Sequence, residues 1–300
     1  MNPFVSVIIP TYGGESSLKK AVDSVLVQDY DQFEVIIVDD NGLGTEKQII
    51  TEKMMSDYIN NDKVVYIKHE KNKNGSAARN TGLRHSRGKY ISFLDDDDVF
   101  LQGKISEQVK FLEENLQYDA AYCWRYAGGK VITSNSEGDL SEELLDLSFT
   151  PYTSSLMIRR EVCIKLDGFD ESYYRHQDFE FLLRFFRRFK MGVVREPLIE
   201  IIGNGVDNQP KGKKAVELKK KFLDTFQKNI AEIDRNHPGF QKRVYAKHYA
   251  ILMVKLIRYG NFALAVQVYF SEAYKGGILF WKEFYKQLSV LVGKRVKNRN

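Results

Sequence analysis

Four consecutive aspartates, Asp95–Asp98, follow the apolar run 88–94 and are the residues best suited to chemistry in this chain. Each carboxylate raises the pKa of its neighbours, so the group requires a strong positive counter-charge. Oxygen ligands of this kind suit a hard divalent cation, Mg²⁺ or Mn²⁺. The apolar run has the character of a buried strand, and an open α/β sheet binds its ligands beyond the carboxyl ends of its strands. A solvated acidic turn is the alternative interpretation.

The first hundred residues show strands alternating with helices. Apolar runs at 4–10, 33–38 and 64–67 have the length of buried strands, and apolar residues recur at helical spacing in 18–26 and 49–58. Near-continuous Val and Ile runs of this kind predict a parallel sheet that helices cover on both faces. No G-x-G-x-x-G motif follows the first strand, which argues against a nicotinamide or flavin enzyme.

Polar residues follow the first two strands. Thr11 and Tyr12 lie after the first strand, where backbone N–H groups and an aromatic ring can hold a nucleobase. Asp39 and Asp40 end the second strand, where a carboxylate can accept a hydrogen bond from a base N–H. Capping of the next helix is the alternative role for Asp39, but Thr45 is better placed for it.

Six segments, in order and in spacing, resemble the family-2 glycosyltransferases of the GT-A fold. The resemblance covers residues 4–205 and implies an α/β fold with a mostly parallel sheet flanked by helices, followed by a C-terminal helical region. The six segments are VIIPTY (7–12), VIIVDD (35–40), NGSAARNTG (74–82), FLDDDD (93–98), GFDE (168–171) and QDFEFLL (177–183).

The resemblance implies a nucleotide-sugar site in the N-terminal half. In the family, the loop after the first strand lines a uridine pocket, the acids after the second strand read uracil, and the arginine equivalent to Arg79 lies by the base. Asn80 is then expected to fix a loop, and a purely structural Arg79–Asp pair is the alternative. The residues implied for the nucleotide-sugar are Pro10, Thr11, Tyr12, Asp39, Asp40, Arg79, Asp95 and Asp96.

The four aspartates match the family pattern Asp-x-Asp-Asp, with Asp95 in the first position and Asp96 in the variable one. The resemblance implies that Asp97 binds the metal, with Asp95 or Asp98 contacting ribose or acting as a further ligand. The pattern leaves open which aspartate makes which contact, and we predict Asp97 and Asp98 as the metal ligands. The cation would neutralise charge on the departing nucleoside diphosphate.

Asp178 is the residue that the resemblance identifies as the catalytic base of inverting members. A base there would take the proton from an acceptor hydroxyl as it attacks the anomeric carbon. Gln177 replaces the glutamate that usually precedes this aspartate, which leaves the base itself intact. A carboxylate that only stabilises a helix N-terminus is the alternative.

Many family members also carry a histidine after the last strand of the catalytic domain. The equivalent stretch here, 201–208, has none, so Asn204 or Asp207 is a candidate replacement. The histidines elsewhere in the catalytic region are expected to face solvent or lie in loops rather than bind metal. They are His69, His85 and His176.

Charge divides the chain into two parts. Residues 211–300 hold 20 Lys and Arg against 6 Asp and Glu, with many aromatic residues at helical spacing. We therefore expect a catalytic domain at 1–210, with a nucleotide half at 1–100 and an acceptor half at 101–210, and a basic helical region at 211–300. That region suits an anionic membrane surface or a lipid-diphosphate-linked acceptor. A helical bundle with a solvated basic face is the alternative, and nucleic acid is not expected.

Cysteine usage and hydropathy bear on the cellular compartment. Cys123 and Cys163 are far apart and predict neither a disulfide framework nor a zinc site. The chain opens directly on its first strand and contains no apolar stretch of about 18 residues, so we expect no signal peptide and a cytoplasmic protein. Its oligomeric state is left open.

The predicted activity is an inverting, metal-dependent, hexosyltransferase-type reaction. A sugar would pass from a UDP-sugar to a hydroxyl of a growing, lipid-linked glycan in surface polysaccharide assembly. One alternative is a sugar-nucleotide nucleotidyltransferase, although the loop 11–14 lacks the basic residue that such enzymes need. Another is a catalytically silent nucleotide-sugar-binding protein.

Overall fold

The computed structural model describes residues 2–297 except 14, 151 and 204–209. The chain forms two compact units. One contains Met1–Ser141 and Pro151–Val206, and the other contains Glu142–Thr150 and Asp207–Asn300. Residues 142–150, expected in the acceptor half of the catalytic domain, therefore belong to the C-terminal unit.

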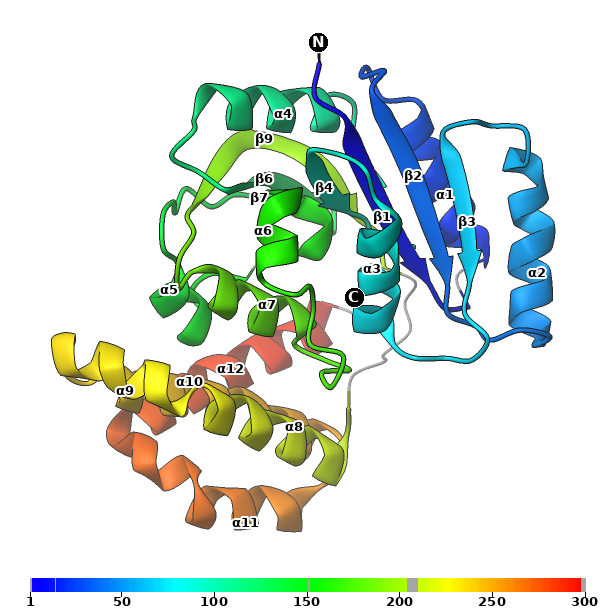
Figure 1. The fold of residues 1–300 in the computed structure, drawn as a ribbon. Coiled ribbons are helices and arrows are strands. Elements are labelled where there is room, and N and C mark those ends of the chain that lie inside the picture. The colour runs from blue at the N-terminus through cyan, green and yellow to red at the C-terminus, as the bar shows by residue number, and fades with distance from the viewer. Residues whose placement is uncertain (1, 14, 151, 204–209, 298–300) are drawn as a thin grey trace. The chain divides into compact units, whose positions relative to one another are not determined.

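The first unit is built on one sheet, with strand order β3-β2-β1-β4-β8-β6-β9-β5 and β7 paired with β6 (Figure 1). The α/β class is confirmed. In the N-terminal half, the four strands β3, β2, β1 and β4 are parallel to one another. The strands β8, β5 and β7 pair antiparallel with their neighbours, so the sheet as a whole is mixed. The strands are β1 (Val5–Thr11), β2 (Phe33–Asp39), β3 (Val64–Lys68), β4 (Tyr90–Phe93), β5 (Asp98–Phe100), β6 (Ala120–Ala127), β7 (Lys130–Ile132), β8 (Met157–Arg159) and β9 (Met191–Ile201).

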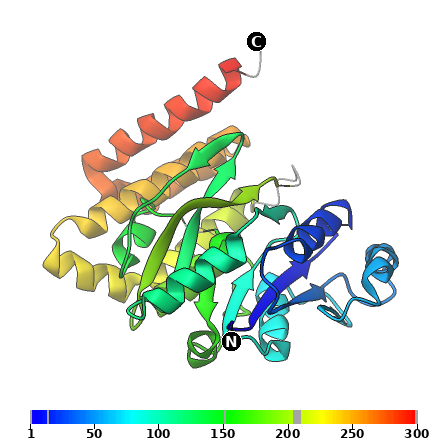
Figure 2. The same cartoon turned by 90° about the horizontal axis from the view of Figure 1, so that it is seen from above.

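The N-terminal half of the sheet is covered on both faces, as the unbroken apolar strands predict. Alternate residues of β2 enter two clusters: Val35 and Ile37 pack in the cluster that includes α1, and Ile36 and Val38 pack with Ala78 of α3. Figures 1 and 2 show α1 and α3 on opposite faces of these strands. The helices of this unit are α1 (Glu15–Leu26), α2 (Glu46–Met55), α3 (Gly75–His85), α4 (Lys104–Glu114), α6 (Arg160–Lys165) and α7 (Gln177–Phe185), with short 3₁₀ turns η1 (Ser56–Tyr58) and η2 (Thr153–Ser155).

Small residues let α3 lie directly on β1. A Cβ added at Gly82 would lie 2.4 Å from Cγ2 of Ile8, so no larger residue fits there without movement. Asn74 begins the helix with a positive φ of 98°, and its Oδ1 accepts hydrogen bonds from the backbone N–H groups of Ser76 and Ala77. This cap satisfies two of the free N–H groups at the helix start. The start of α3, which precedes Arg79 by one turn, is thereby held in place.

The second unit is helical. It consists of α8 (Gly212–Thr225), α9 (Gln227–Asn236), α10 (Phe240–Arg258), α11 (Phe262–Ser271), the 3₁₀ turn η3 (Ala273–Gly276) and α12 (Gly277–Lys297), and the end of α5 (Ser141–Leu145) joins it. None of the described helices has the length and apolar character of a membrane span.

The segment 142–150 joins this unit because α10 supplies its hydrogen-bond donors. His248 contacts the carbonyl oxygen of Leu145 through Nε2 at 2.7 Å. Arg243 and Lys247 both donate to Asp146, at 3.0 and 3.2 Å. These partners lie about a hundred residues away, so the local sequence of 142–150 does not reveal the association.

Both cysteines are buried free thiols. Burial raises the pKa of Cys123 to about 11 and that of Cys163 to about 12, so neither is a thiolate at neutral pH. The expectation that they form no disulfide is confirmed.

Candidate active site

Asp96 holds the loop that follows β1. The hydroxyl of Thr11 donates to Asp96 Oδ2 at 2.6 Å, and the backbone N–H of Tyr12 donates to the same oxygen at 3.3 Å. The ring of Tyr12 is 59% exposed and is available to a ligand. The structure therefore brings the expected nucleotide loop and the aspartate run together.

Lys47 of α2 also contacts this loop. It is not among the site residues expected from the sequence. Its Nζ lies 4.5 Å from the centre of the Tyr12 ring. A cation beside the loop is suited to a phosphate or to a carboxylate. Helical periodicity places Lys47 on an exposed face, but no local pattern links it to Tyr12.

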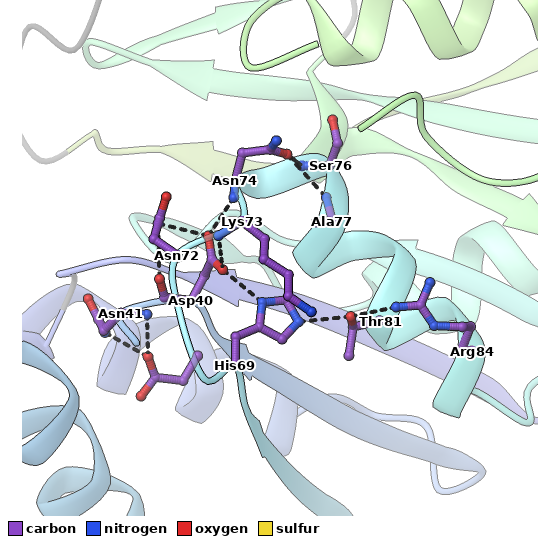
Figure 3. Close-up of polar contacts among 11 residues, drawn as sticks. Asp40, Asn41, His69, Asn72, Lys73, Asn74, Ser76, Ala77, Thr81 and Arg84 are labelled. Carbon is purple, nitrogen blue, oxygen red and sulfur yellow. Dashed lines mark hydrogen bonds and ion pairs between the residues drawn. The ribbon is translucent and has the colours of Figure 1, made fainter. Parts of the chain in front are cut away.

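Asp40 forms hydrogen bonds with the protein through both carboxylate oxygens (Figure 3), and its role in reading the base stays a prediction. Its two oxygens accept from the backbone N–H groups of Lys73 and Asn74, both at 2.8 Å, and from the side chain of Asn72 at 2.9 Å. His69 Nδ1 lies 2.7 Å from Oδ1. A carboxylate has about four acceptor positions, and these contacts occupy them all.

Asp39 is less occupied but fully buried. Oδ1 accepts from the backbone N–H and the side-chain amide of Asn41, at 2.9 and 2.8 Å, and Oδ2 accepts from the Tyr66 hydroxyl. One acceptor position on Oδ2 is left over. Base recognition by Asp39 stays a prediction. Thr45 caps α2 by accepting from the backbone N–H of Gln48, as expected.

His69 lies in the loop after β3, as expected, but it is buried rather than solvent-facing. Besides Asp40, it contacts the Thr81 hydroxyl through Nε2 at 2.8 Å, and Arg84 donates to the same hydroxyl (Figure 3). The His69 ring lies between Asp40, which follows β2, and Thr81 of α3, and it is buried because it links these two elements. His85 is exposed, as expected.

Arg79 connects the aspartate run to α7. One terminal nitrogen donates to Asp95 Oδ1 at 2.5 Å, and the other donates to Gln177 Oε1 at 2.6 Å. The guanidinium lies 5.7 Å from the ring centre of Phe169, and its Nε is buried without a hydrogen-bond partner. Residues from α3, the loop after β4 and α7 therefore meet at one guanidinium next to Asp178.

Asn80 fixes the loop that carries Phe169. Its amide donates to the Phe169 carbonyl at 2.8 Å, and its Oδ1 accepts from the Phe169 backbone N–H at 2.8 Å. Gly168 allows this approach, because an added Cβ would lie 2.3 Å from Asn80 Oδ1. The Asn80 carboxamide thus supports the ring beneath Arg79.

Gly168→Ala should destabilise the first unit by about 2 kcal/mol or more. Gly168 has φ +64°, where an alanine is strained, and the new Cβ would also displace Asn80. Gly128→Ala is the matched control, since Gly128 has φ +57° with nothing within 4 Å. Urea unfolding measures both. Equal losses in the two variants would show that the Asn80 contact contributes nothing.

The last two aspartates differ in their surroundings. Asp97 lies in the turn before β5, partly buried, whereas Asp98 lies within β5 and is only 4% exposed. Ser154 donates to Asp98 Oδ2 at 2.6 Å and accepts from the backbone N–H of Asp95 at 3.1 Å. Burial, with the neighbouring charge of Asp95, raises the pKa of Asp98 to about 8. Burial likewise raises the pKa of Asp96 to about 6.

Asp178 lies in the first turn of α7, partly buried. Burial raises its pKa to about 6, against the opposing effects of the Phe179 backbone N–H and the positive charge of Arg79. Such a carboxylate is ionised at neutral pH yet basic enough to take a proton. His176, with φ 57°, begins the helix without a side-chain cap. Asn204 and Asp207 lie outside the described residues.

Comparison with known proteins identifies the family. The model of glycosyl transferase family 2 matches residues 6–189. The chain belongs to this family. It is 30% identical over 208 residues to an uncharacterized glycosyltransferase of Methanocaldococcus jannaschii, covering 66% of this chain and 70% of that protein. It is 29% identical over 213 residues to the amylovoran biosynthesis glycosyltransferase AmsB of Erwinia amylovora, covering 64% and 67%. It spans 59% of a Rickettsia prowazekii relative at 33% identity.

Solved structures agree on the fold. TarS 1-349 of S. aureus in complex with UDP-GlcNAc superposes with a TM-score of 0.61 at 15% identity, covering 97% of this chain and 92% of that one. The mannosyltransferase PcManGT of Pyrobaculum calidifontis, in complex with GDP-Man and Mn²⁺, gives 0.58 at 17% identity, covering 99% and 87%. The GT-A-like fold of this family-2 glycosyltransferase is thereby confirmed.

Proposed function

We propose that this protein is an inverting, metal-dependent glycosyltransferase that moves a sugar from a UDP-sugar to a hydroxyl of a growing, lipid-linked glycan. The observation that carries the proposal is the guanidinium of Arg79, which contacts both Asp95 and Gln177. This supports the proposal because the contact joins Asp95 of the aspartate run to Gln177, the residue that precedes the expected base Asp178 in α7. A family-2 protein retaining both parts is suited to catalysis rather than to silent binding.

The aspartate run fits a divalent cation, Mn²⁺ or Mg²⁺. Burial raises the pKa of both Asp96 and Asp98, and the charges of the neighbouring aspartates add to this effect. A bound cation would stabilise the ionised form of these carboxylates. Among the described residues, no three His, Cys, Asp or Glu side chains are grouped to hold an ion by themselves. Asp97 and Asp98 would therefore share the ion with the donor diphosphate and water, as Mg²⁺ sites commonly do. The ion would supply charge neutralisation of the leaving diphosphate.

The protein groups around the donor have separate roles in the proposal. Asp96 holds Thr11 and the Tyr12 backbone, so the exposed Tyr12 ring is positioned to stack on the base. Arg79 holds Asp95 toward the ribose and diphosphate. Asp178 accepts the acceptor's hydroxyl proton as the oxygen attacks the anomeric carbon, and inversion follows from this single displacement.

The acceptor is proposed to be an anionic, lipid-linked glycan at the cytoplasmic face of the cell membrane. AmsB is named for amylovoran biosynthesis, which supports polysaccharide assembly as the setting. The basic C-terminal region, with 20 Lys and Arg against 6 Asp and Glu, supports an anionic partner. The proposed partners remain the donor, the glycan and the membrane surface, without nucleic acid.

A thermal-shift screen of UDP- and GDP-sugars, with Mn²⁺ and with EDTA, tests the donor. At a hundredfold excess over Kd, a ligand adds about 2.7 kcal/mol of stability, equivalent to roughly 5 °C or more for a unit of this size. We expect that shift with UDP-sugars in Mn²⁺ and a much smaller one in EDTA. A shift with GDP-sugars alone would overturn the UDP assignment.

A further inference from the structure

The C-terminal unit exposes an apolar face on two helices. We define the α11–α12 face as Phe262, Val266 and Phe270 on α11 and Ile278, Trp281 and Tyr285 on α12. These six side chains are between 40% and 85% exposed. The α11 members are spaced four residues apart and so form one stripe. Unlike the rest of this basic unit, α11 contains no charged residue.

The two stripes join through aromatic contacts. The ring of Tyr269 lies 5.2 Å from that of Phe270 and 5.2 Å from that of Trp281, and Trp281 lies 6.4 Å from Tyr285. The exposed rings of Phe270, Trp281 and Tyr285 are therefore neighbours, and Phe262 and Val266 extend this surface along α11. A contiguous apolar patch of this kind marks an interaction site, because isolated exposed hydrophobic residues need no partner but a joined set is costly in water.

Charge at the edge of the face selects the occupant. Lys282 and Lys286 are exposed on α12 beside the apolar residues, whereas Lys275 of η3 is exposed but forms an ion pair with Glu272 at 2.8 Å. Pairing two copies through this face would bring these lysines together in a unit that already has a large positive excess. An anionic lipid surface would neutralise them, and Trp, Tyr and Lys are the residues that favour a membrane–water interface.

We propose that the α11–α12 face docks in the plane of a bilayer containing anionic phospholipid, with the six apolar side chains among the acyl chains and Lys282 and Lys286 at the headgroups. The helices lie on the membrane and do not cross it. This inference rests on the membrane surface proposed above as a partner and names the face that binds it; it is measured without donor or acceptor, so its failure would leave the proposed sugar transfer untouched.

The docking is tested by flotation of the full chain with vesicles. The vesicles contain phosphatidylcholine alone or phosphatidylcholine with about 30% phosphatidylglycerol. We expect binding to anionic vesicles at low salt, weakened at high salt, with a blue shift of tryptophan emission that Trp281→Phe removes. Phe262→Gln/Phe270→Gln/Ile278→Gln should reduce binding at least tenfold. Lys282→Gln/Lys286→Gln should reduce it roughly fivefold per lysine.

Matched controls alter equally exposed residues of the first unit. Val27→Gln/Ile59→Gln/Leu116→Gln removes apolar side chains that are 68%, 81% and 75% exposed, and Lys110→Gln/Lys130→Gln removes two exposed lysines. Both controls should float like the wild type. Wild type that ignores anionic vesicles at low salt would overturn the proposal. The proposal would also be overturned if the wild type formed dimers and bound no vesicles, and if the triple α11–α12 variant were monomeric.

Discussion

Asp97→Ala is expected to abolish the dependence of UDP binding on a divalent cation and to lower sugar transfer by at least about two to three orders of magnitude. Electrostatic groups that stabilise developing charge contribute on this scale when they are removed singly. The four adjacent carboxylates repel a diphosphate unless a cation lies between them. Calorimetric titration of UDP in Mn²⁺ and in EDTA measures the effect as a ratio of affinities.

Asp96→Asn is the matched control for this experiment. Asp96 contacts Thr11 and the Tyr12 backbone, so its loss should weaken UDP binding by a similar factor in Mn²⁺ and in EDTA. Only Asp97→Ala should bring the ratio close to one while the fold is retained. If wild-type protein bound UDP equally in EDTA and in Mn²⁺, the metal assignment would be wrong.

Local patterns were sufficient to predict the framework of the site. The apolar runs that became β1, β2 and β4 end within a residue or two of the positions expected, because continuous apolar runs in the interior of a parallel sheet are buried on both faces. The aspartates could be placed at the end of β4 for the same reason. The parallel sheet was correct where these strands pair and incomplete beyond β4, where β5, β7 and β8 contain only three residues each and pair antiparallel with their neighbours.

The contacts that distinguish one acidic residue from another could not be predicted. Asp39 and Asp40 are neighbours of the same type, yet Asp40 is occupied by the backbone of Lys73 and Asn74. Asp98 is held by Ser154, which lies far along the chain. Each partner is defined by tertiary structure, as it is for buried His69. Chemistry could therefore be assigned from the sequence to the aspartate run as a group, but not to its members.

Asp178→Asn is expected to lower transfer by roughly two to four orders of magnitude while UDP binding in Mn²⁺ stays near wild type. The amide is close in size to the carboxylate but cannot accept the hydroxyl proton. If Asp178 only stabilises the start of α7, its charge is worth about 0.3–1 kcal/mol and turnover would be nearly normal. Single-turnover assays at saturating donor separate the two roles.

The pH profile provides the second test of this assignment. Burial raises the pKa of Asp178 to about 6, so the carboxyl group is protonated below that pH and inactive as a base. Wild-type transfer should rise between about pH 5 and 7 and then level off, and the residual activity of Asp178→Asn should lack this rise. Glu180→Gln on the same helix breaks the ion pair with Arg184, at 2.5 Å, and should lower stability while keeping the rise. An unchanged pH profile in Asp178→Asn would assign the proton transfer to another group.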